Sequence, residues 1–174
     1  MKISQNGIDL IKKYEGFKDR SYVCPAGVRT IGYGTTRING RPVQRGMSCT
    51  RVQAEGWLRN DADDFLDQIE PMIRDSSILD QNQIDALASF VYNVGIGNFK
   101  KSNLLKHIND GFLVLAADEF KRWNKGGGRV LAGLVARREE EAELFRSFKS
   151  DKEFKSEKVK AKPSSESDNN FLNN

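Results

Sequence analysis

The stretch from Tyr22 to Pro42 constrains the fold more than any other part of this chain. It is rich in glycine and β-branched residues, and Asn39-Gly40 within it favours a type I′ hairpin turn. At most three short antiparallel strands fit into its length. Such a sheet is too small to be the frame of the fold, so helices must supply the rest.

Helical signals flank this stretch on both sides. Ser4 can cap a first helix that ends near Glu15, and Thr50 with Gln53 forms a capping box for a second, long helix. Apolar residues at helical spacing predict further helices at 81–94, 98–108, 112–123 and 130–148. The glycines at 126–128 indicate a flexible turn between the last two helices. The whole pattern predicts an α+β fold.

The composition changes sharply after Phe148. Lys, Ser, Glu, Asp and Asn dominate residues 149–174, and few apolar residues remain there to form a core. We expect one domain at residues 1–148 and a flexible polar tail at 149–174. The lysines of the tail could contact an anionic polymer, or the tail could be a solvated extension.

The net charge of +4 and a sequence pI of about 9.1 favour anionic partners. Nucleic acid, anionic membranes and bacterial cell wall all qualify, and the charge does not choose among them. The lysines and arginines are not concentrated on one helix, which counts against a nucleic-acid-binding protein. We therefore expect no nucleic-acid partner.

The sequence shows no pattern typical of export or of membrane insertion. Residues 1–7 turn polar at once, and no run approaches the roughly 18 apolar residues that span a bilayer. We expect a protein that stays in the cytoplasm of its producer. Cys24 and Cys49 lack the paired spacing of a zinc site, and His107 is the single histidine. The two cysteines could form a single disulfide, but we expect two free thiols because no secretory signal accompanies them, and we expect no metal.

Glu15, Cys24 and Thr30 are the candidate catalytic residues. Glu15 falls at the end of the first helix, where the partial negative charge of the helix C-terminus disfavours an ionised carboxylate. A general acid needs such a place, because it must hold a proton before it can donate one. Cys24 and Thr30 follow on the glycine-rich turn and strand. An isolated Glu before a Gly is most often a surface residue, so its neighbours must decide.

These neighbours form a long and ordered pattern. Residues 14–17, 24–27 and 30–36 resemble, in order and spacing, the catalytic segment of the phage-type lysozymes, glycoside hydrolase family 24. The chain is also similar to the helical lobe of this family at residues 80–87, 90–95 and 133–139. A resemblance of this length is far more specific than a single short motif.

The resemblance implies a two-lobed lysozyme fold. A small lobe with the β-hairpin would carry the catalytic residues, and a larger helical lobe would face it across a sugar-binding cleft. The long helix from about Thr50 would join the two lobes. The implied reaction is hydrolysis of the β-1,4 bond between N-acetylmuramic acid and N-acetylglucosamine in peptidoglycan. It would proceed with inversion at the anomeric carbon and without a cofactor or metal.

The resemblance also implies roles for single residues. Glu15 would be the proton donor, and Thr30 would help to hold the attacking water. Asn93, Arg137 and Arg138 would bind the substrate, and one of the two arginines would reach back to orient Glu15.

Cys24 departs from the pattern of the family, whose more familiar members have an Asp at this position. A thiol with an ordinary pKa of about 8.5 is only a few per cent thiolate at neutral pH. Three interpretations stay open. Cys24 could act as a thiolate in place of the carboxylate, or it could be a spectator beside Glu15 and Thr30. The chain could also be a catalytically impaired pseudoenzyme that binds peptidoglycan.

The family implies a phage or prophage endolysin as the biological setting. Such a protein would act on peptidoglycan as a monomer. It would wait in the host cytoplasm until a holin permeabilises the membrane. A lytic transglycosylase is a rival interpretation, because it also uses one Glu.

Other acidic residues carry weaker signals. Asp19 could serve as a substitute base, although a solvated turn residue is the simpler interpretation. Asp61, Asp63 and Asp64 are expected on the polar side of the long helix, and they lack the alternating ligand spacing of a calcium site.

Overall fold

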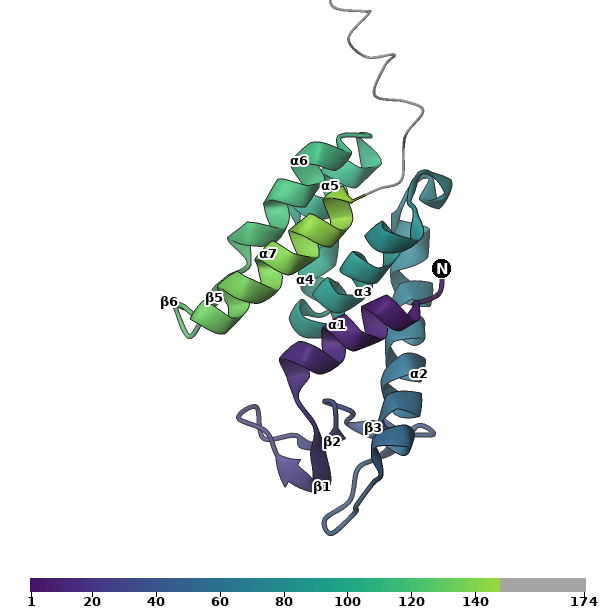
Figure 1. The fold of residues 1–174 in the computed structure, drawn as a ribbon, viewed down its shortest axis with the longest axis vertical. Coiled ribbons are helices and arrows are strands. Elements are labelled where there is room, and N and C mark those ends of the chain that lie inside the picture. Colours follow the sequence, from purple (N-terminus) through teal and green to yellow (C-terminus); the bar gives the residue numbers. More distant parts are fainter. Residues whose placement is uncertain (148–174) are drawn as a thin grey trace, which may run out of the picture.

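The computed structural model describes residues 1–147 and shows two lobes of unequal size (Figure 1). Short strands form the smaller lobe, and helices form the larger one. Helix α2 (Arg51–Ile69) runs along one side of the molecule from the first lobe into the second. This arrangement confirms the predicted α+β fold with a long helix that begins after Thr50. The predicted tail at 149–174 lies outside the described residues.

The small lobe holds four strands where at most three were predicted. β1 (Lys18–Val23) pairs with β2 (Arg29–Gly32), and β3 (Arg37–Ile38) pairs with β4 (Arg41–Pro42), both antiparallel. β1 begins before the predicted start at Tyr22, because its first residues are exposed and polar and carry no β-branched signal. The four strands form two separate pairs, so the sheet remains a minor part of the fold.

The predicted hairpin turn at Asn39-Gly40 is confirmed. Asn39 and Gly40 have φ angles of 52° and 75°, and Ile38 pairs with Arg41 across them. Two consecutive positive φ angles are what a type I′ turn requires. The turn brings the tip of the β3–β4 hairpin to α2, where it forms one wall of a pocket.

Helix α1 (Gln5–Glu15) ends where the first helix was predicted to end. The Ser4 hydroxyl accepts a hydrogen bond from a backbone N–H of the first turn, and Gly16 closes the helix with a φ of 67°. The buried apolar side of α1 packs against α3 (Gln81–Val94). Helix α1 belongs to the large lobe and ends where the chain enters the small lobe (Figure 1), and Glu15 is its last residue.

Asp85 anchors the start of α1. This buried carboxylate of α3 accepts a hydrogen bond from the Ser4 backbone N–H at 2.8 Å and another from the Ser4 hydroxyl. Gly7 permits the close approach, because a Cβ at this position would lie 2.8 Å from Asp85 Oδ1. Because the first turn of α1 is fixed to α3, the position of Glu15 at the other end of the helix is fixed as well.

Helices α2 and α3 both begin with capping boxes. The box of α2 pairs Thr50 with Gln53, as predicted, and that of α3 pairs Asp80 with Gln83. α3 ends at Gly95, whose φ of 82° is favourable for glycine alone among common residues. These signals are local, which is why the boundaries of both helices could be read from the sequence.

The predicted helix at 98–108 is divided in the structure. α4 (Ile96–Lys100) stops, and α5 (Asn103–Asn109) starts again because the Ser102 hydroxyl caps its first turn. α6 (Leu113–Glu119) and α7 (Ala132–Arg146) complete the large lobe.

The glycine-rich segment between α6 and α7 turns the chain, as predicted, and it does so in a short hairpin that the sequence did not indicate. β5 (Lys125–Gly126) pairs with β6 (Arg129–Val130), and Gly127 and Gly128 turn the chain with φ angles of 56° and 79°. Short 3-10 turns occupy Glu70–Met72, Ser76–Ile78 and Phe120–Arg122.

Aromatic side chains fill the centre of the large lobe. The ring of Phe120 lies 5.1 Å from that of Phe90 in α3 and 5.5 Å from that of Phe145 in α7. All three are buried, and each contributes about 2–3 kcal/mol through burial of apolar surface. This core fixes α7 against α3, and α7 supplies Arg137, which reaches Glu15. Within residues 1–147, no helix is both long and apolar enough to cross a membrane.

Candidate functional site

Glu15 forms an ion pair with Arg137 of α7. Arg137 Nη1 lies 2.6 Å from Glu15 Oε1, although 122 positions separate the two residues in the sequence. The side chain of Glu15 is 23% exposed, whereas that of Arg137 is only 3% exposed. Glu15 therefore has one side held by a buried guanidinium and another side open to solvent, where a substrate can approach.

Arg138, the other arginine predicted to bind substrate or orient Glu15, does not reach it. Its side chain is wholly buried, and its guanidinium lies 5.0 Å from the centre of the Phe90 ring. Its Nη2 donates to Glu141 Oε1 at 2.7 Å. Burial lowers the pKa of Arg138 to about 10, so it stays charged at neutral pH. The prediction that Arg138 binds substrate finds no support in this placement, because the side chain has no open side.

Gly34 lies beside Glu15 and Tyr92. A Cβ at this position would lie 3.9 Å from Glu15 Oε2 and 3.4 Å from the hydroxyl of Tyr92, and the φ of 107° is unfavourable for any side chain. The Tyr92 hydroxyl donates to the Tyr33 carbonyl at 3.0 Å. The sequence marks Gly34 as a strand glycine only, since the groups that approach it come from other elements.

Cys24 and Thr30 lie together at the end of the β1–β2 hairpin. The Cys24 N–H donates to the Val28 carbonyl at 2.9 Å, and the Thr30 hydroxyl donates to the same oxygen at 3.1 Å. Gly27 tightens the turn by donating to the Cys24 carbonyl at 2.8 Å. Cys24 is half-buried and Thr30 is buried. The hairpin thus brings the thiol and the hydroxyl next to each other, as their spacing in the sequence suggested.

The surroundings of Cys24 favour its thiolate. Hydrogen bonds from the backbone of Val28 and of Ala26 lower the pKa of the thiol. Desolvation opposes them with a smaller effect than either bond, and the Thr30 hydroxyl lowers the pKa slightly further. A lowered pKa raises the fraction of thiolate at neutral pH. Of the three interpretations of Cys24, the first therefore has a physical basis in the hairpin itself. Cys49, the second cysteine, is also free.

Tyr22 links the two candidates, and sequence reasoning missed it. Burial raises the pKa of its phenol, and the negative charges of Cys24 and Glu15 raise it further. Both groups must lie near Tyr22 to act on it in this way. The position of Tyr22 two residues before Cys24 was the available signal, but an exposed aromatic on a strand has no distinctive pattern.

Asn93 and Asp19 are exposed. Asn93 lies next to Tyr92 near the end of α3, and its side chain makes no hydrogen bond within residues 1–147. Asp19 lies on β1, where its carbonyl accepts from the Cys49 N–H at 2.8 Å. Neither Asn93 nor Asp19 forms a hydrogen bond with Glu15 in the described part of the chain. The role of each therefore stays a prediction from the sequence.

Asp61 differs from its neighbours Asp63 and Asp64, although all three were expected on a polar helix face. Asp61 is half-buried and accepts a hydrogen bond from the Thr35 hydroxyl at 2.8 Å. Burial raises its pKa to about 6, and the charge of Asp64 adds to the rise. Asp63 accepts from the Ile3 N–H at 2.9 Å, and Asp64 is exposed. In the described part of the chain, no cluster of His, Cys, Asp and Glu could hold a metal ion.

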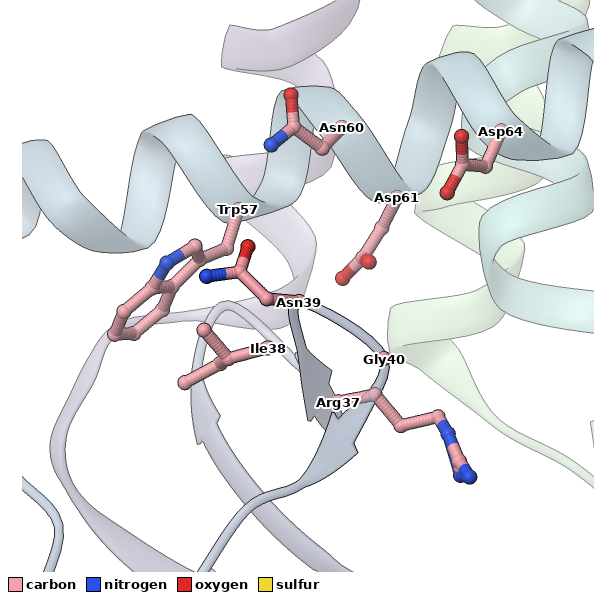
Figure 2. Close-up of a pocket in the computed structure, with 8 residues that line it drawn as sticks. All are labelled: Arg37, Ile38, Asn39, Gly40, Trp57, Asn60, Asp61 and Asp64. Carbon is pink, nitrogen blue, oxygen red and sulfur yellow. The ribbon is translucent and has the colours of Figure 1, made fainter.

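Asp61 lines a pocket of about 410 Å³ between α2 and the β3–β4 hairpin. Trp57 and Asp61 point from α2 toward the β3–β4 hairpin, whereas Arg37 points away from the helix (Figure 2). An indole ring beside amide and carboxylate groups offers both an apolar face and hydrogen-bonding groups. The pocket adjoins the buried Thr35, whose neighbour in the sequence is Gly34 beside Glu15.

Comparison with known proteins identifies the family. A family model described as phage lysozyme matches residues 12–141. The chain belongs to the phage lysozyme family. The endolysin of Bacillus phage PZA is 46% identical over 149 residues, which is 84% of this chain and 56% of that protein. This phage lysozyme chain thus spans about half the length of that relative.

Two further relatives match nearly along their whole length. The endolysin of Acyrthosiphon pisum secondary endosymbiont phage 1 is 40% identical over 84% of this chain and 99% of that protein. Among solved structures, the endolysin from Escherichia coli O157:H7 phage FAHEc1 superposes with a TM-score of 0.75 at 38% identity. It covers 84% of this chain and 94% of that one. The predicted phage lysozyme fold is therefore confirmed.

Proposed function

We propose that this chain is a muramidase that hydrolyses the β-1,4 bond between N-acetylmuramic acid and N-acetylglucosamine in peptidoglycan. The observation that carries the proposal is the placement of Glu15 in a phage lysozyme fold. This carboxyl group is backed by the buried Arg137, is open on its other side, and lies near the Cys24–Thr30 hairpin.

Glu15 is the general acid of the proposed reaction. It donates its proton to the glycosidic oxygen as the bond from this oxygen to the anomeric carbon breaks. A water molecule attacks the anomeric carbon from the opposite face, which inverts its configuration. Arg137 holds the Glu15 carboxyl group in place and stabilises the carboxylate that remains after the proton has left.

Cys24 is the proposed base. As a thiolate it takes the proton of the attacking water, and Thr30 holds that water with a hydroxyl that can both donate and accept. The lowered pKa of the thiol supports this role, because the base must be ionised before it can act. A spectator Cys24 would leave Glu15 and Thr30 to do the work, and a pseudoenzyme would bind the wall without cleaving it.

The pocket beside α2 is a candidate site for a further sugar residue of the glycan strand. Trp57 offers a ring face to the apolar side of a sugar, and Asn39 and Asn60 offer amide groups (Figure 2). We expect Trp57→Ala to raise KM several-fold for long glycan strands and to leave kcat near the native value. Val52→Ala, on the same helix and exposed, is the matched control.

The proposed setting is phage-induced lysis, in which the protein acts on the cell wall as a monomer. Residence in the host cytoplasm before lysis, and release by a holin, belong to the same proposal. Expression in a bacterial host with and without a holin tests the release step. We expect lysis with the holin only, and lysis without it would show another route to the wall.

Purified peptidoglycan tests the enzymatic proposal. The native chain should clear a wall suspension, whereas Glu15→Gln should lose at least about a thousandfold in rate, since the amide has no proton to donate. Glu139→Gln, an exposed position on α7, should keep the native rate. Mass spectrometry should find reducing-end N-acetylmuramic acid. Wall binding without cleavage would indicate the pseudoenzyme, and an anhydromuramic product would indicate a transglycosylase.

A further inference from the structure

A buried group of charged side chains lies between α3 and α7, behind Glu15. Its centre is Glu141, which has no exposed surface. One oxygen, Glu141 Oε1, accepts from Arg138 Nη2 at 2.7 Å, from Ser89 Oγ at 2.7 Å and from Arg137 Nε at 3.1 Å. The other oxygen, Oε2, has no hydrogen-bond partner among the described residues.

Contacts within this group fix the guanidinium of Arg137 independently of its contact with Glu15. Arg137 Nε points at Glu141, and Nη2 donates to the Ser89 carbonyl at 3.0 Å. Only Nη1 is left, and it donates to Glu15 Oε1 at 2.6 Å. Because the guanidinium is planar, fixing two of its nitrogens also fixes the direction of the third.

We propose that Glu141 is a positioning residue that determines how much of the positive charge of Arg137 acts on Glu15. The inference rests on the proposed function, in which Glu15 must hold a proton until the glycosidic bond breaks. It assigns Glu141 a role through Arg137, because Glu141 is buried away from any substrate.

The balance of charge supports this role. Two guanidinium groups, those of Arg137 and Arg138, face two carboxyl groups, those of Glu141 and Glu15. Without Glu141, the carboxylate of Glu15 would be the single counter-charge for two buried cations. Glu15 would then hold its ionised form strongly and would give up its role as a proton donor near neutral pH.

Glu141 is itself ionised in this arrangement. Burial raises the pKa of Glu141, and the guanidinium groups of Arg138 and Arg137 oppose that rise. A proton on Oε2 would be a buried donor without an acceptor, because nothing in residues 1–147 pairs with this oxygen. The contacts with the two arginine guanidinium groups therefore favour the ionised form of Glu141 over its protonated form.

Three tyrosines are further titratable groups around this cluster. Burial raises the pKa of all three, and they belong to α1, β1 and α3: Tyr14, Tyr22 and Tyr92. They remain neutral near pH 7. On the outer side, Glu140 accepts from the Tyr14 hydroxyl and from Lys13, both at 2.6 Å, and is balanced by the latter. The Glu140–Lys13 pair is therefore separate from the cluster, and removing the charge of Glu141 alters only the pairs of Glu141 with Arg137 and Arg138.

Glu141→Gln is the matched substitution. The amide oxygen can keep the three bonds that Oε1 accepts. The amide nitrogen takes the place of Oε2, where its N–H groups have no acceptor among the described residues and should lower stability. The charge is lost while the shape is kept. We expect the pKa of Glu15, followed by the ¹³C resonance of its labelled carboxyl group, to fall by about one unit, as expected when one buried counter-charge is removed. The alkaline limb of wall lysis should move by the same amount, about tenfold in rate at pH 7.

Arg138→Met is a second variant with the opposite expectation. It removes one cation from Glu141, which then acts on Arg137 alone, so the pKa of Glu15 should rise. Glu143→Gln, exposed on the same helix, should change neither quantity. A role in stability alone would lower the melting temperature in both buried variants and leave the titration of Glu15 as in the native chain, and this result would overturn the proposal. If Glu141→Gln does not fold, a titration of Glu15 that is unchanged in Arg138→Met overturns it as well.

The NMR titration keeps this inference separate from the proposed function. A shifted pKa of Glu15 without any wall lysis in the native chain would refute the muramidase and retain the positioning role. Wall lysis by the native chain, together with an unshifted pKa of Glu15 in the variants, would support the muramidase and refute the positioning role.

Discussion

The two halves of the candidate site are built in opposite ways. Glu15 is held by Arg137, a buried residue 122 positions away, which is in turn held by Glu141 and Ser89. Cys24, by contrast, is held by backbone groups of its own exposed hairpin. The chemistry of the acid thus depends on the packing of the large lobe, and that of the thiol depends on a local turn. Substitutions behind Glu15 should therefore change stability and activity together, whereas those at Cys24 should change activity alone.

Arg137→Met should have the largest effect. The substitution leaves Glu141 with one cation in place of two and frees the Glu15 carboxyl group. We expect a loss of about 3 kcal/mol in unfolding free energy, as for a broken buried ion pair. Wall lysis should fall about a hundredfold, because a misplaced catalytic group is costly. Thermal unfolding and the clearing of a wall suspension measure the two effects.

A matched control is Arg146→Met on the same helix. Arg146 pairs with Asp118 on the surface, where ion pairs contribute little. Its unfolding free energy should stay within about 0.5 kcal/mol of the native value. Equal melting temperatures of the two variants would show that the buried ion pair contributes no more to stability than the exposed one.

Cys24→Ser should lower wall lysis about tenfold to a hundredfold, and Cys24→Asp should be active. Both should unfold within about 0.5 kcal/mol of the native chain, because the thiol contributes little to packing. Native lysis should rise with pH as the thiolate forms, at a pH below that of an ordinary thiol. In Cys24→Asp this rise should move to much lower pH, since a carboxyl group ionises near 3.9. A serine variant as active as the native chain would show Cys24 to be a spectator.

Asp61→Asn tests a buried carboxylate that lacks the two cations of Glu141. The pKa of Asp61 is about 6 in the folded chain and 3.8 without its surroundings. Between these values the folded state binds more protons, so stability should fall as the pH rises from about 4 to 6. The loss should be about 1–2 kcal/mol for this half-buried group. In Asp61→Asn, which keeps an acceptor for Thr35, the loss should vanish.

Melting temperatures at pH 4 and pH 7 provide the measurement. Asp67→Asn, at an exposed position on the same helix, should keep the native pH dependence. The assignment to Asp61 would be wrong if its Asn variant lost as much stability as the native chain over this range.

Thr30→Val should have the smallest effect. It removes one of the groups that lower the pKa of Cys24 and keeps the backbone bonds that lower it more. The alkylation rate of Cys24 at pH 7, in a Cys49→Ser background, should fall about threefold to fivefold, as for one lost hydrogen bond. An unchanged rate would mean that the Thr30 hydroxyl does not reach the thiolate.

The contrast between the two halves also explains what the sequence could predict. The cap at Ser4, the capping box at Thr50 and the turn at Asn39-Gly40 are local signals, and the structure confirms all three. The order of Cys24 and Thr30 on one hairpin is local as well. These features depend on residues a few positions apart, so a single sequence contains them.

Long-range contacts escaped prediction for the same reason. The sequence left open which of two adjacent arginines reaches Glu15, since Arg137 and Arg138 are alike in residue type. Their positions on α7 decide, because the helix turns Arg137 toward α1 and Arg138 into the core. The role of Glu141 was invisible, because a Glu in a run of acidic residues reads as a solvated surface. The exposed start of β1 was missed because it lacks any apolar alternation.

The pairing of α1 with α7 has a consequence for the order in which the protein is made. Glu15 emerges from the ribosome early during synthesis. Arg137 and Glu141, which orient it, emerge only near the end of the described chain. Until α7 has emerged and docked, the nascent chain carries the acid without its support. A chain cut short before α7 would keep the hairpin and the thiol and would lack an oriented proton donor. Under the proposed function, bond cleavage begins only when synthesis of the domain is complete.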